Sequence, residues 1–170
     1  MTSPPAPILV ASELGAWANA QRDAGRSIVF TNGCFDLLHE GHARSIEEAA
    51  RLGDVLLVAT NSDASARTLK GPDRPVVGQD ARAALLAALR WVDAVTIFDA
   101  PSVLDTILAV RPHIVAKGGE YDETKVVGAS EIQAWGGRVA RLSMIEGVGT
   151  THILSRIRHG GGNRDSPTKD

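Results

Sequence analysis

Two histidines separated by two residues are the first candidates for chemistry in this chain. His39 and His42 close the segment 33–42, GCFDLLHEGH. Residues three apart in the first turn of a helix project from one side, so both imidazoles can face the same ligand. Gly41 lies between them and, having no side chain, lets a bulky group approach the backbone. A helix start adds unpaired N–H groups and a partial positive charge, so the segment suits a polyphosphate.

The histidine pair also has other interpretations. Taken alone, a His-x-x-His is more often an incidental, solvent-exposed pair. A zinc-hydrolase His-Glu-x-x-His needs two residues after the glutamate, whereas only Gly41 follows Glu40. The chain has no Gly-Lys-Ser/Thr of a P-loop and no Gly-x-Gly-x-x-Gly after its first apolar strand. These absences weigh against P-loop and dinucleotide-cofactor sites.

Apolar strands alternate with amphipathic helices along the chain. Near-continuous apolar strands of this kind indicate a parallel sheet that is covered on both faces. We therefore expect an α/β fold: a Rossmann-like, doubly wound, parallel five-stranded sheet in a single domain. In such a sheet ligands bind at the carboxyl ends of the strands, which is where the histidine segment falls. The expected strands are 27–32, 54–61, 94–98, 113–119 and 138–142, and the expected helices are 12–24, 42–52, 80–89, 101–110, 129–135 and 150–158, with a Gly/Pro-rich loop at 68–79.

Composition limits the classes of function. The 170 residues are 44% hydrophobic and 22% charged, the balance of an ordinary globular domain. A net charge of −2 offers no basic field for nucleic acid, and no apolar run is long enough to cross a membrane. We expect a cytoplasmic protein, with a flexible N-terminal segment at 1–11, the domain at 12–158 and a disordered tail at 159–170.

The segment 33–42 resembles the signature of the cytidylyltransferase-like nucleotidyltransferases, whose hallmark is His-x-Gly-His. The likeness extends from about residue 27 to residue 158. Within the superfamily the chain is most similar to the adenylyltransferases that convert D-glycero-β-D-manno-heptose 1-phosphate to ADP-heptose. The segments that carry this narrower likeness are NSD at 61–63, LKG at 69–71, RPV at 74–76, KGGEY at 117–121 and GVGTT at 147–151.

The resemblance implies roles for individual residues. His39, His42 and Lys70 would be catalytic: the histidines contact the triphosphate and stabilise charge on the phosphorus under attack, and the lysine neutralises phosphate oxygens. Two further sets would bind the substrates. The nucleotide-binding set is Cys34, Phe35, Gly41, Arg82, Gly118, Gly119, Glu120, Gly149, Thr150 and Thr151, and the substrate-binding set is Asn32, Asp36, Asn61 and Asp63.

Several of these residues also have a structural interpretation. Lys70 by itself is more often a solvated charge, and Arg82 could pair with Asp80 or Glu47 on the surface. Thr150 could be an ordinary helix cap. Cys34, the only cysteine, could be a small buried hydrophobe, and phosphoryl chemistry needs no enzyme nucleophile.

Two positions depart from related sequences. Family members usually carry Ser-Thr-Thr where this chain has Gly149-Thr150-Thr151, so one hydroxyl is missing. The glycerol-phosphate cytidylyltransferases carry an arginine ahead of this motif, where this chain has Met144. The second difference favours ATP over CTP.

The resemblance implies transfer of AMP from ATP to a sugar 1-phosphate, with release of pyrophosphate. The expected acceptor is D-glycero-β-D-manno-heptose 1-phosphate, which would give ADP-heptose. Mg²⁺ would be bound through the nucleotide phosphates, with no metal ligands from the protein. ATP and a small sugar phosphate are the expected partners of a homodimer. The alternatives are a glycerol-phosphate-type cytidylyltransferase that uses CTP, and a non-catalytic nucleotide-binding module.

Overall fold

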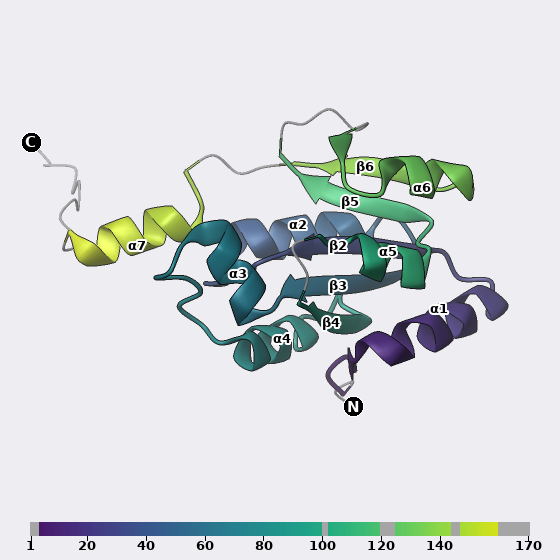
Figure 1. Ribbon diagram of the computed structural model, residues 1–170, viewed down its shortest axis with the longest axis horizontal. Helices are drawn as coiled ribbons and strands as arrows, with labels where there is room; N and C mark the ends of the chain where they lie inside the picture. The colour runs from purple at the N-terminus through teal and green to yellow at the C-terminus, as the bar shows by residue number, and fades with distance from the viewer. Residues whose placement is uncertain (1–3, 100–101, 120–124, 144–146, 160–170) are drawn as a thin grey trace, which may run out of the picture.

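The centre of the fold is a parallel sheet of six strands. A computed structural model describes residues 4–99, 102–119, 125–143 and 147–159. The strand order is β1-β4-β3-β2-β5-β6, and every neighbouring pair is parallel (Figure 1). The strands are β1 (Ile8–Leu9), β2 (Ile28–Gly33), β3 (Val55–Asn61), β4 (Ala94–Phe98), β5 (Ile114–Gly118) and β6 (Arg138–Leu142).

Helices cover both faces of the sheet, and each face has its own apolar core. On one face Val29, Leu56 and Val58 pack against apolar residues of α2 and α4. On the other face Ile28, Phe30 and Leu57 pack against α1, α5 and α6. The helices are α1 (Leu14–Asp23) after a 3-10 turn at Ala11–Glu13, α2 (Glu40–Ala50), α3 (Asp63–Lys70), α4 (Gln79–Ala87), α5 (Leu104–Val110), α6 (Ala129–Ala134) and α7 (Thr150–Arg158).

The direction of winding reverses at β2. The chain passes from β2 to β3 and β4 on one side, then returns to place β5 and β6 on the other side. In register, Thr31 of β2 lies between Val58 of β3 and Ala116 of β5. A doubly wound sheet binds ligands outside the carboxyl ends of the strands at such a reversal. The segment that follows β2 contains the histidine pair.

The α/β class, the parallel order and the doubly wound single domain are confirmed, but the predicted strand count is wrong. The sixth strand, β1, pairs with β4 through Ile8 and Val95 and through Leu9 and Thr96. These two residues fall in the segment that we expected to be a flexible N-terminus. A two-residue edge strand carries no periodic pattern, and the prolines before it favoured a loop. Residues 160–170, most of the predicted disordered tail, lie outside the described residues.

Two helices also differ from expectation. The structure has a helix, α3, at Asp63–Lys70, where no helix was predicted and the loop was expected from residue 68. Its sequence buries little besides Ser65 and Ala66, so it lacks an apolar stripe, and the Ser62 side chain caps it by accepting from Ser65 N–H. Helix α2 begins at Glu40 rather than His42 because His39 caps it.

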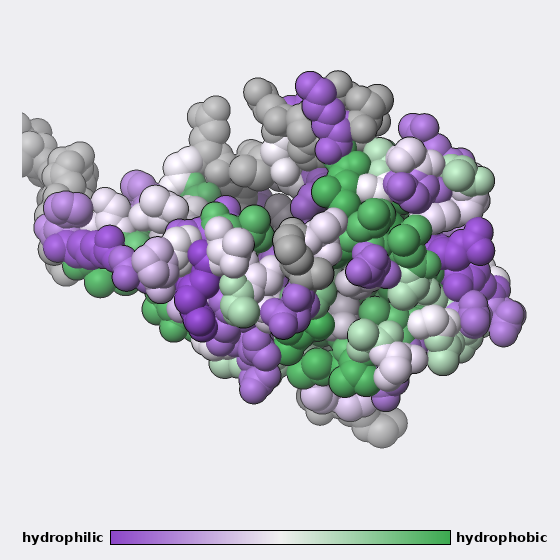
Figure 2. Space-filling model, viewed as in Figure 1, coloured by the Kyte–Doolittle hydropathy of each residue, from purple (hydrophilic) through white to green (hydrophobic). Residues whose placement is uncertain are grey.

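Figure 2 shows apolar side chains on one face of the molecule. Apolar side chains gather there over α5, where Leu108 is 43% exposed and Val127, just before α6, is 45% exposed. Apolar patches of this kind are typical of contact surfaces. Among the described residues, no helix is long and apolar enough to cross a bilayer.

Candidate active site

A cavity of about 350 Å³ opens at the carboxyl ends of β2 and β5. Three segments distant in sequence line it. Thr31 to Asp36 and the start of α2 form one wall, and the region of Lys70 and Arg74 forms a second. The third comprises Gly118, Leu142 and the start of α7 from Val148 to Thr151. The cavity therefore lies where the winding reverses, as the sheet topology requires.

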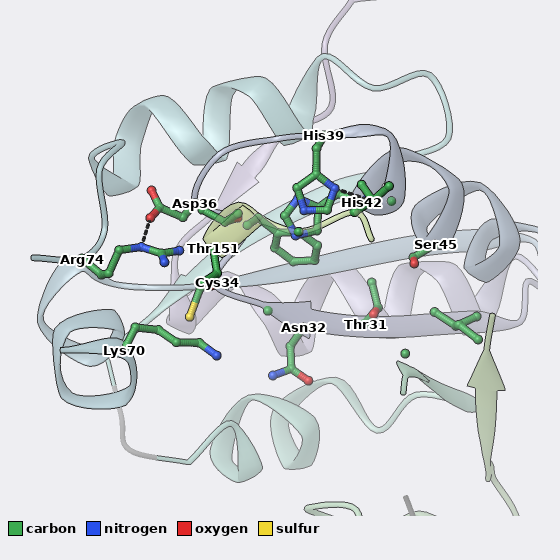
Figure 3. Close-up of a pocket in the computed structure, with 18 residues that line it drawn as sticks. Thr31, Asn32, Cys34, Asp36, His39, His42, Ser45, Lys70, Arg74 and Thr151 are labelled. Atoms are coloured by element: carbon green, nitrogen blue, oxygen red, sulfur yellow. Dashed lines mark hydrogen bonds and ion pairs between the residues drawn. The ribbon is translucent and has the colours of Figure 1, made fainter. Parts of the chain in front are cut away.

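The two histidines lie face to face at the start of α2. Their ring centroids are 3.8 Å apart and the ring planes differ by 21°. His39 is the N-cap of the helix, and its Nδ1 accepts a hydrogen bond of 3.4 Å from His42 N–H. The rings of Phe35 and His42 pack in an edge-to-face arrangement, with their centroids 5.2 Å apart. The prediction that both imidazoles face one ligand site is thus consistent with the geometry (Figure 3).

Gly41 has a packing reason for lacking a side chain. A Cβ atom at this position would lie 3.0 Å from both Cε1 and Nδ1 of His39. Such a contact is tighter than nine in ten real Cβ contacts, so the His39 ring would have to shift by a few tenths of an ångström. The stacked pair and the glycine between its members therefore depend on each other.

The surroundings of both imidazoles lower their pKa and so favour the neutral form. Burial lowers the pKa of His42 to about 4, and the neighbouring His39 adds to this shift, while the Leu37 backbone and Asp36 oppose it. Burial also lowers the pKa of His39, against the opposing effect of Glu40. Neutral rings offer N–H donors without a fixed charge. An anion placed against them would raise both pKa values and draw in protons.

The backbone after β2 is held in an unusual conformation. Phe35 has φ of +46°, in the left-handed region, and its side chain is 7% exposed. Its ring packs so closely against Gly33 that a Cβ there would be 3.2 Å from Cε2. Strained conformations of non-glycine residues gather at functional sites. Here the turn buries most of Phe35 and places Cys34, Phe35 and Asp36 along the cavity.

Cys34 is not placed as a nucleophile. Burial raises the pKa of its thiol, against the opposing effect of Lys70, Arg82 and Arg74. The thiol donates to Asn61 Oδ1 at 3.4 Å. Cys34 lines the cavity as a protonated thiol, and Asn61 contacts it from behind.

Asp36 fixes the loop between α3 and α4. Its side chain is 1% exposed, and Oδ1 accepts from Val76 N–H at 2.7 Å and Val77 N–H at 2.9 Å. Oδ2 accepts from Arg74 Nε, whose side chain is 15% exposed. The carboxylate thus holds three donors from one short loop. That loop carries Arg74 into the cavity.

Arg82, which the resemblance assigns to the nucleotide, binds other parts of the protein in this structure. Its side chain is fully buried and does not line the cavity. A guanidinium has five N–H donors, and each of these has a protein acceptor. The acceptors are Val77 O at 2.9 Å, Cys34 O at 2.6 Å, Thr60 Oγ1 at 2.7 Å, Asn61 O at 2.7 Å and Asp63 Oδ1 at 2.9 Å.

This arrangement also explains Asn61 and Asp63. Asp63 pairs with Arg82, and the Asn61 amide donates to Ser65 Oγ at 2.8 Å. Neither side chain lines the cavity, so their expected contact with substrate is not found in this structure. The two residues lie in the support beneath the site. The surface pairing of Arg82 with Asp80 or Glu47 is likewise not what the structure shows.

The start of α7 forms part of the third wall. Gly149 is its N-cap, with extended backbone and no side-chain hydrogen bond, and a Cβ there would have no neighbour within 4 Å. Thr150 and Thr151 line the cavity beside it. None of the described residues of α7 is buried. The helix therefore presents its N-terminal end to the cavity with little packing of its own.

Most of the predicted residues meet at this cavity. The predicted residues that line it are Asn32, Cys34, Phe35, Asp36, His39, Gly41, His42, Lys70, Gly118, Gly149, Thr150 and Thr151. Gly119 does not line it, and Glu120 lies outside the described residues.

Sequence reasoning did not assign to the site six residues that line the cavity: Thr31, Gly33, Ser45, Arg74, Leu142 and Val148. Ser45 follows His42 by three positions on α2, so helical spacing could have found it. Leu142 ends β6 and could have been found by inspecting the end of each strand. Arg74 lay in a segment that carried the family resemblance, but nothing in the sequence pairs it with Asp36.

The described residues contain no group of three or more His, Cys, Asp or Glu side chains placed to hold a metal ion. The amide oxygen of Asn32 is buried and has no hydrogen-bond partner among these residues. An acceptor in this state suits a hydroxyl or amine donor from a ligand.

Comparison with known proteins agrees with this geometry. Residues 30–146 match the family described as Cytidylyltransferase-like. The chain is 47% identical over 144 residues to "Bifunctional protein HldE" of Pelobacter propionicus and 48% identical over 136 residues to that of Methylobacillus flagellatus. These matches cover 85% and 80% of this chain but only 30% and 28% of the relatives, so the chain spans about three tenths of their length.

A solved structure gives a further match. The lipopolysaccharide core biosynthesis protein from Thermoplasma volcanium GSS1 is 30% identical and superposes with a TM-score of 0.63. The match covers 72% of this chain and all of the other one. Since the family match spans more than half of the chain and includes the stacked histidines, this protein belongs to the cytidylyltransferase-like family.

Proposed function

We propose that the protein is an adenylyltransferase, which transfers AMP from ATP to a sugar 1-phosphate and releases pyrophosphate. D-glycero-β-D-manno-heptose 1-phosphate is the acceptor that we favour, and ADP-heptose would then be the product. The observation that carries the proposal is the stacked pair His39 and His42 at the start of α2, facing the start of α7 across one cavity. Two helix N-termini and two imidazoles provide donors for a triphosphate.

Three further observations support the sugar phosphate. The relatives named HldE are about 47% identical over most of this chain. The solved relative is described as a lipopolysaccharide core biosynthesis protein. The buried Asn32 oxygen needs a donor, and the hydroxyls of a sugar would supply one. These observations favour a polyhydroxylated acceptor over a simple phosphate.

The reaction requires little covalent chemistry from the protein. A phosphate oxygen of the acceptor attacks the α-phosphorus of ATP, the new P–O bond forms, and the bond to pyrophosphate breaks. The acceptor oxygen is already anionic, so it needs no general base. Catalysis then comes from alignment and from donors aimed at the developing charge.

Each wall of the cavity has a part in that alignment. His39 and His42 donate to oxygens around the α-phosphorus and take up protons as charge accumulates. The N–H groups at the start of α7, with the Thr150 and Thr151 hydroxyls, bind the leaving phosphates. Mg²⁺ would be held by phosphate oxygens and water, where it would neutralise charge. Lys70 adds a positive charge from the end of α3.

A substrate panel tests the proposal. Purified protein is incubated with ATP or CTP and with heptose 1-phosphate, glucose 1-phosphate or glycerol 3-phosphate, and pyrophosphate release is followed. We expect release with ATP and heptose 1-phosphate. His39→Ala and His42→Ala should each lower kcat by about 10²–10³-fold, as for the loss of one electrostatic donor. Wild-type turnover in His39→Ala would refute the mechanism, and preference for CTP would replace the adenylyltransferase with a cytidylyltransferase.

The location of the protein in the cell and its oligomeric state are also proposals. We infer a cytoplasmic enzyme, because its nucleotide substrate is cytoplasmic, and a homodimer, for which the apolar surface around Leu108 and Val127 is the natural contact. Light scattering of the wild-type protein and of Leu108→Glu tests the dimer. A wild-type mass of one chain would exclude it.

A further inference from the structure

The cavity has two chemically different ends. Lys70 and Arg74 enter from one side in Figure 3, whereas Thr31 and Ser45 lie on the opposite side, with the histidine rings between them. Leu142 and Gly118, which pair at the ends of β6 and β5, also line the cavity and carry no charge. A nucleoside is neutral and suits the uncharged end. A second anion then belongs at the cationic end.

We propose that Arg74 binds the phosphate of the acceptor and thereby selects phosphomonoesters for attack on the α-phosphorus. The inference rests on the proposed function and deepens it, because it assigns the acceptor to one residue. Arg74 donates Nε to Asp36, and no other hydrogen bond of its guanidinium is found among the described residues. Its two terminal nitrogens are thus free to donate to oxygens in the cavity that the residue lines.

Arg74 is held more firmly than Lys70. The Asp36 carboxylate is buried and is itself fixed by Val76 N–H and Val77 N–H, so the guanidinium is anchored at one edge. The Lys70 side chain is exposed and lies at the end of a helix. A planar guanidinium bound on one edge presents its other edge as a two-pronged donor, which matches two oxygens of one phosphate.

The ion pair between Arg74 and Asp36 also affects how a phosphate would be recognised. Asp36 offsets much of the charge of Arg74, so this contact contributes shape and hydrogen bonds more than net charge. The free charge of Lys70 remains available to whichever phosphate lies nearby. An ammonium at position 74 could keep the ion pair but would lose the two-pronged donor. Asp36 is accordingly a positioning residue.

The test compares Arg74→Gln and Arg74→Lys with Arg67→Gln. Arg67 is an exposed arginine on α3 that does not line the cavity, so its substitution matches the change in charge. KM for heptose 1-phosphate is measured at saturating ATP, and Kd for ATP is measured by calorimetry. We expect both Arg74 variants to raise the acceptor KM by about 10–100-fold, as for the loss of a charge-assisted hydrogen bond, with the ATP Kd unchanged.

Three outcomes would overturn the inference. An ATP Kd that rises by the same factor as the acceptor KM would assign Arg74 to the triphosphate. An acceptor KM equal to that of Arg67→Gln would remove Arg74 from substrate binding altogether. An acceptor KM of Arg74→Lys equal to that of wild type would show that charge alone is recognised, which contradicts the proposed geometry. Asp36→Asn, which loosens Arg74, should raise the acceptor KM as well.

A binding experiment separates this inference from the proposed function. Inorganic phosphate is titrated into protein saturated with a non-hydrolysable ATP analogue. We expect wild type and Arg67→Gln to bind phosphate and Arg74→Gln to bind it at least about tenfold more weakly. If no acceptor yields pyrophosphate, the proposed function fails while this assay still reports on Arg74. Equal phosphate binding by wild type and Arg74→Gln would refute the inference alone.

Discussion

The Cα of Gly41 lies so close to the imidazole of His39 that a methyl group at position 41 would be 3.0 Å from two ring atoms. The ring in turn stacks on His42 at 3.8 Å. Displacing one ring therefore disturbs the other. The glycine of the His-x-Gly-His segment therefore helps to set the position of both rings, although it has no functional group.

Gly41→Ala should lower kcat while leaving the fold intact. Because the added methyl moves His39 away from its partner, we expect a loss of about 10²-fold, the size of effect that a small misplacement of a catalytic group produces. Gly15→Ala is the matched control, since the only neighbour of its Cβ would be Ala109 O at 3.9 Å. Steady-state pyrophosphate release measures both. Undiminished kcat in Gly41→Ala would show that the ring position is unimportant.

Acid should destabilise the free protein partly through His42. Its pKa is about 4 in the folded state against an ordinary 6.5, so the unfolded chain binds the proton more tightly. Stability is therefore full above pH 6.5 and falls as the pH is lowered from 6.5 toward 4. We expect this residue to account for on the order of 2 kcal/mol after allowance for solvent screening. Urea unfolding at pH 7.5 and pH 5 should show a smaller difference in His42→Asn than in wild type; an equal difference would exclude His42 as a source.

Arg82→Met should destabilise the fold rather than weaken nucleotide binding alone. The substitution removes all five N–H donors of the guanidinium. The Asp63 carboxylate and the carbonyls of Val77, Cys34 and Asn61 then lose the hydrogen bonds that they accept from Arg82. Breaking a buried ion pair by removing one partner costs about 3–5 kcal/mol. Urea unfolding measures the loss, with Arg44→Met as the control, because the Arg44 side chain is 70% exposed. A stable Arg82→Met protein with weak ATP binding would restore the direct contact expected from the family resemblance.

Gly149→Ser should strengthen the start of α7. The backbone there is extended and the added side chain has room, so serine can cap the helix and gain a few tenths of a kcal/mol. Its hydroxyl would also return a donor that related sequences have at this position. We expect a tighter ATP Kd by calorimetry, whereas Gly149→Ala should not tighten it. A serine variant no tighter than the alanine variant would show that the missing hydroxyl does not contribute.

The long-range architecture was predictable because it follows from periodic burial. Strands such as Ala94–Phe98 and Arg138–Leu142 agree with their predicted bounds, since apolar runs end where the chain leaves the sheet. The short strand Ile8–Leu9 and helix α3 were not predictable in this way. Both are stabilised by pairing or capping, through Val95 and Ser62 respectively, and neither depends on a repeating apolar pattern.

The site was predictable to the extent that its residues belong to local motifs. His39, Gly41 and His42 act within one helical turn, so spacing alone suggests their shared face. The hydrogen-bond partners of Arg82 lie between 5 and 48 positions away in the sequence, and those of Asp36 lie 38 to 41 positions away. No local pattern encodes such contacts. Only the fold distinguishes the arginine that faces the cavity from the one that lies beneath it.

The exposure of the last helix suggests a second role for a bound nucleotide. Helix α7 buries none of its described residues, yet Thr150 and Thr151 at its start line the cavity. A triphosphate bound there would therefore add contacts that hold the helix in place. Substrate would then tether the end of the domain to the turn after β2, more than 100 positions earlier in the chain. Release of product would loosen that tether, so turnover and the ordering of the C-terminal helix would proceed in step.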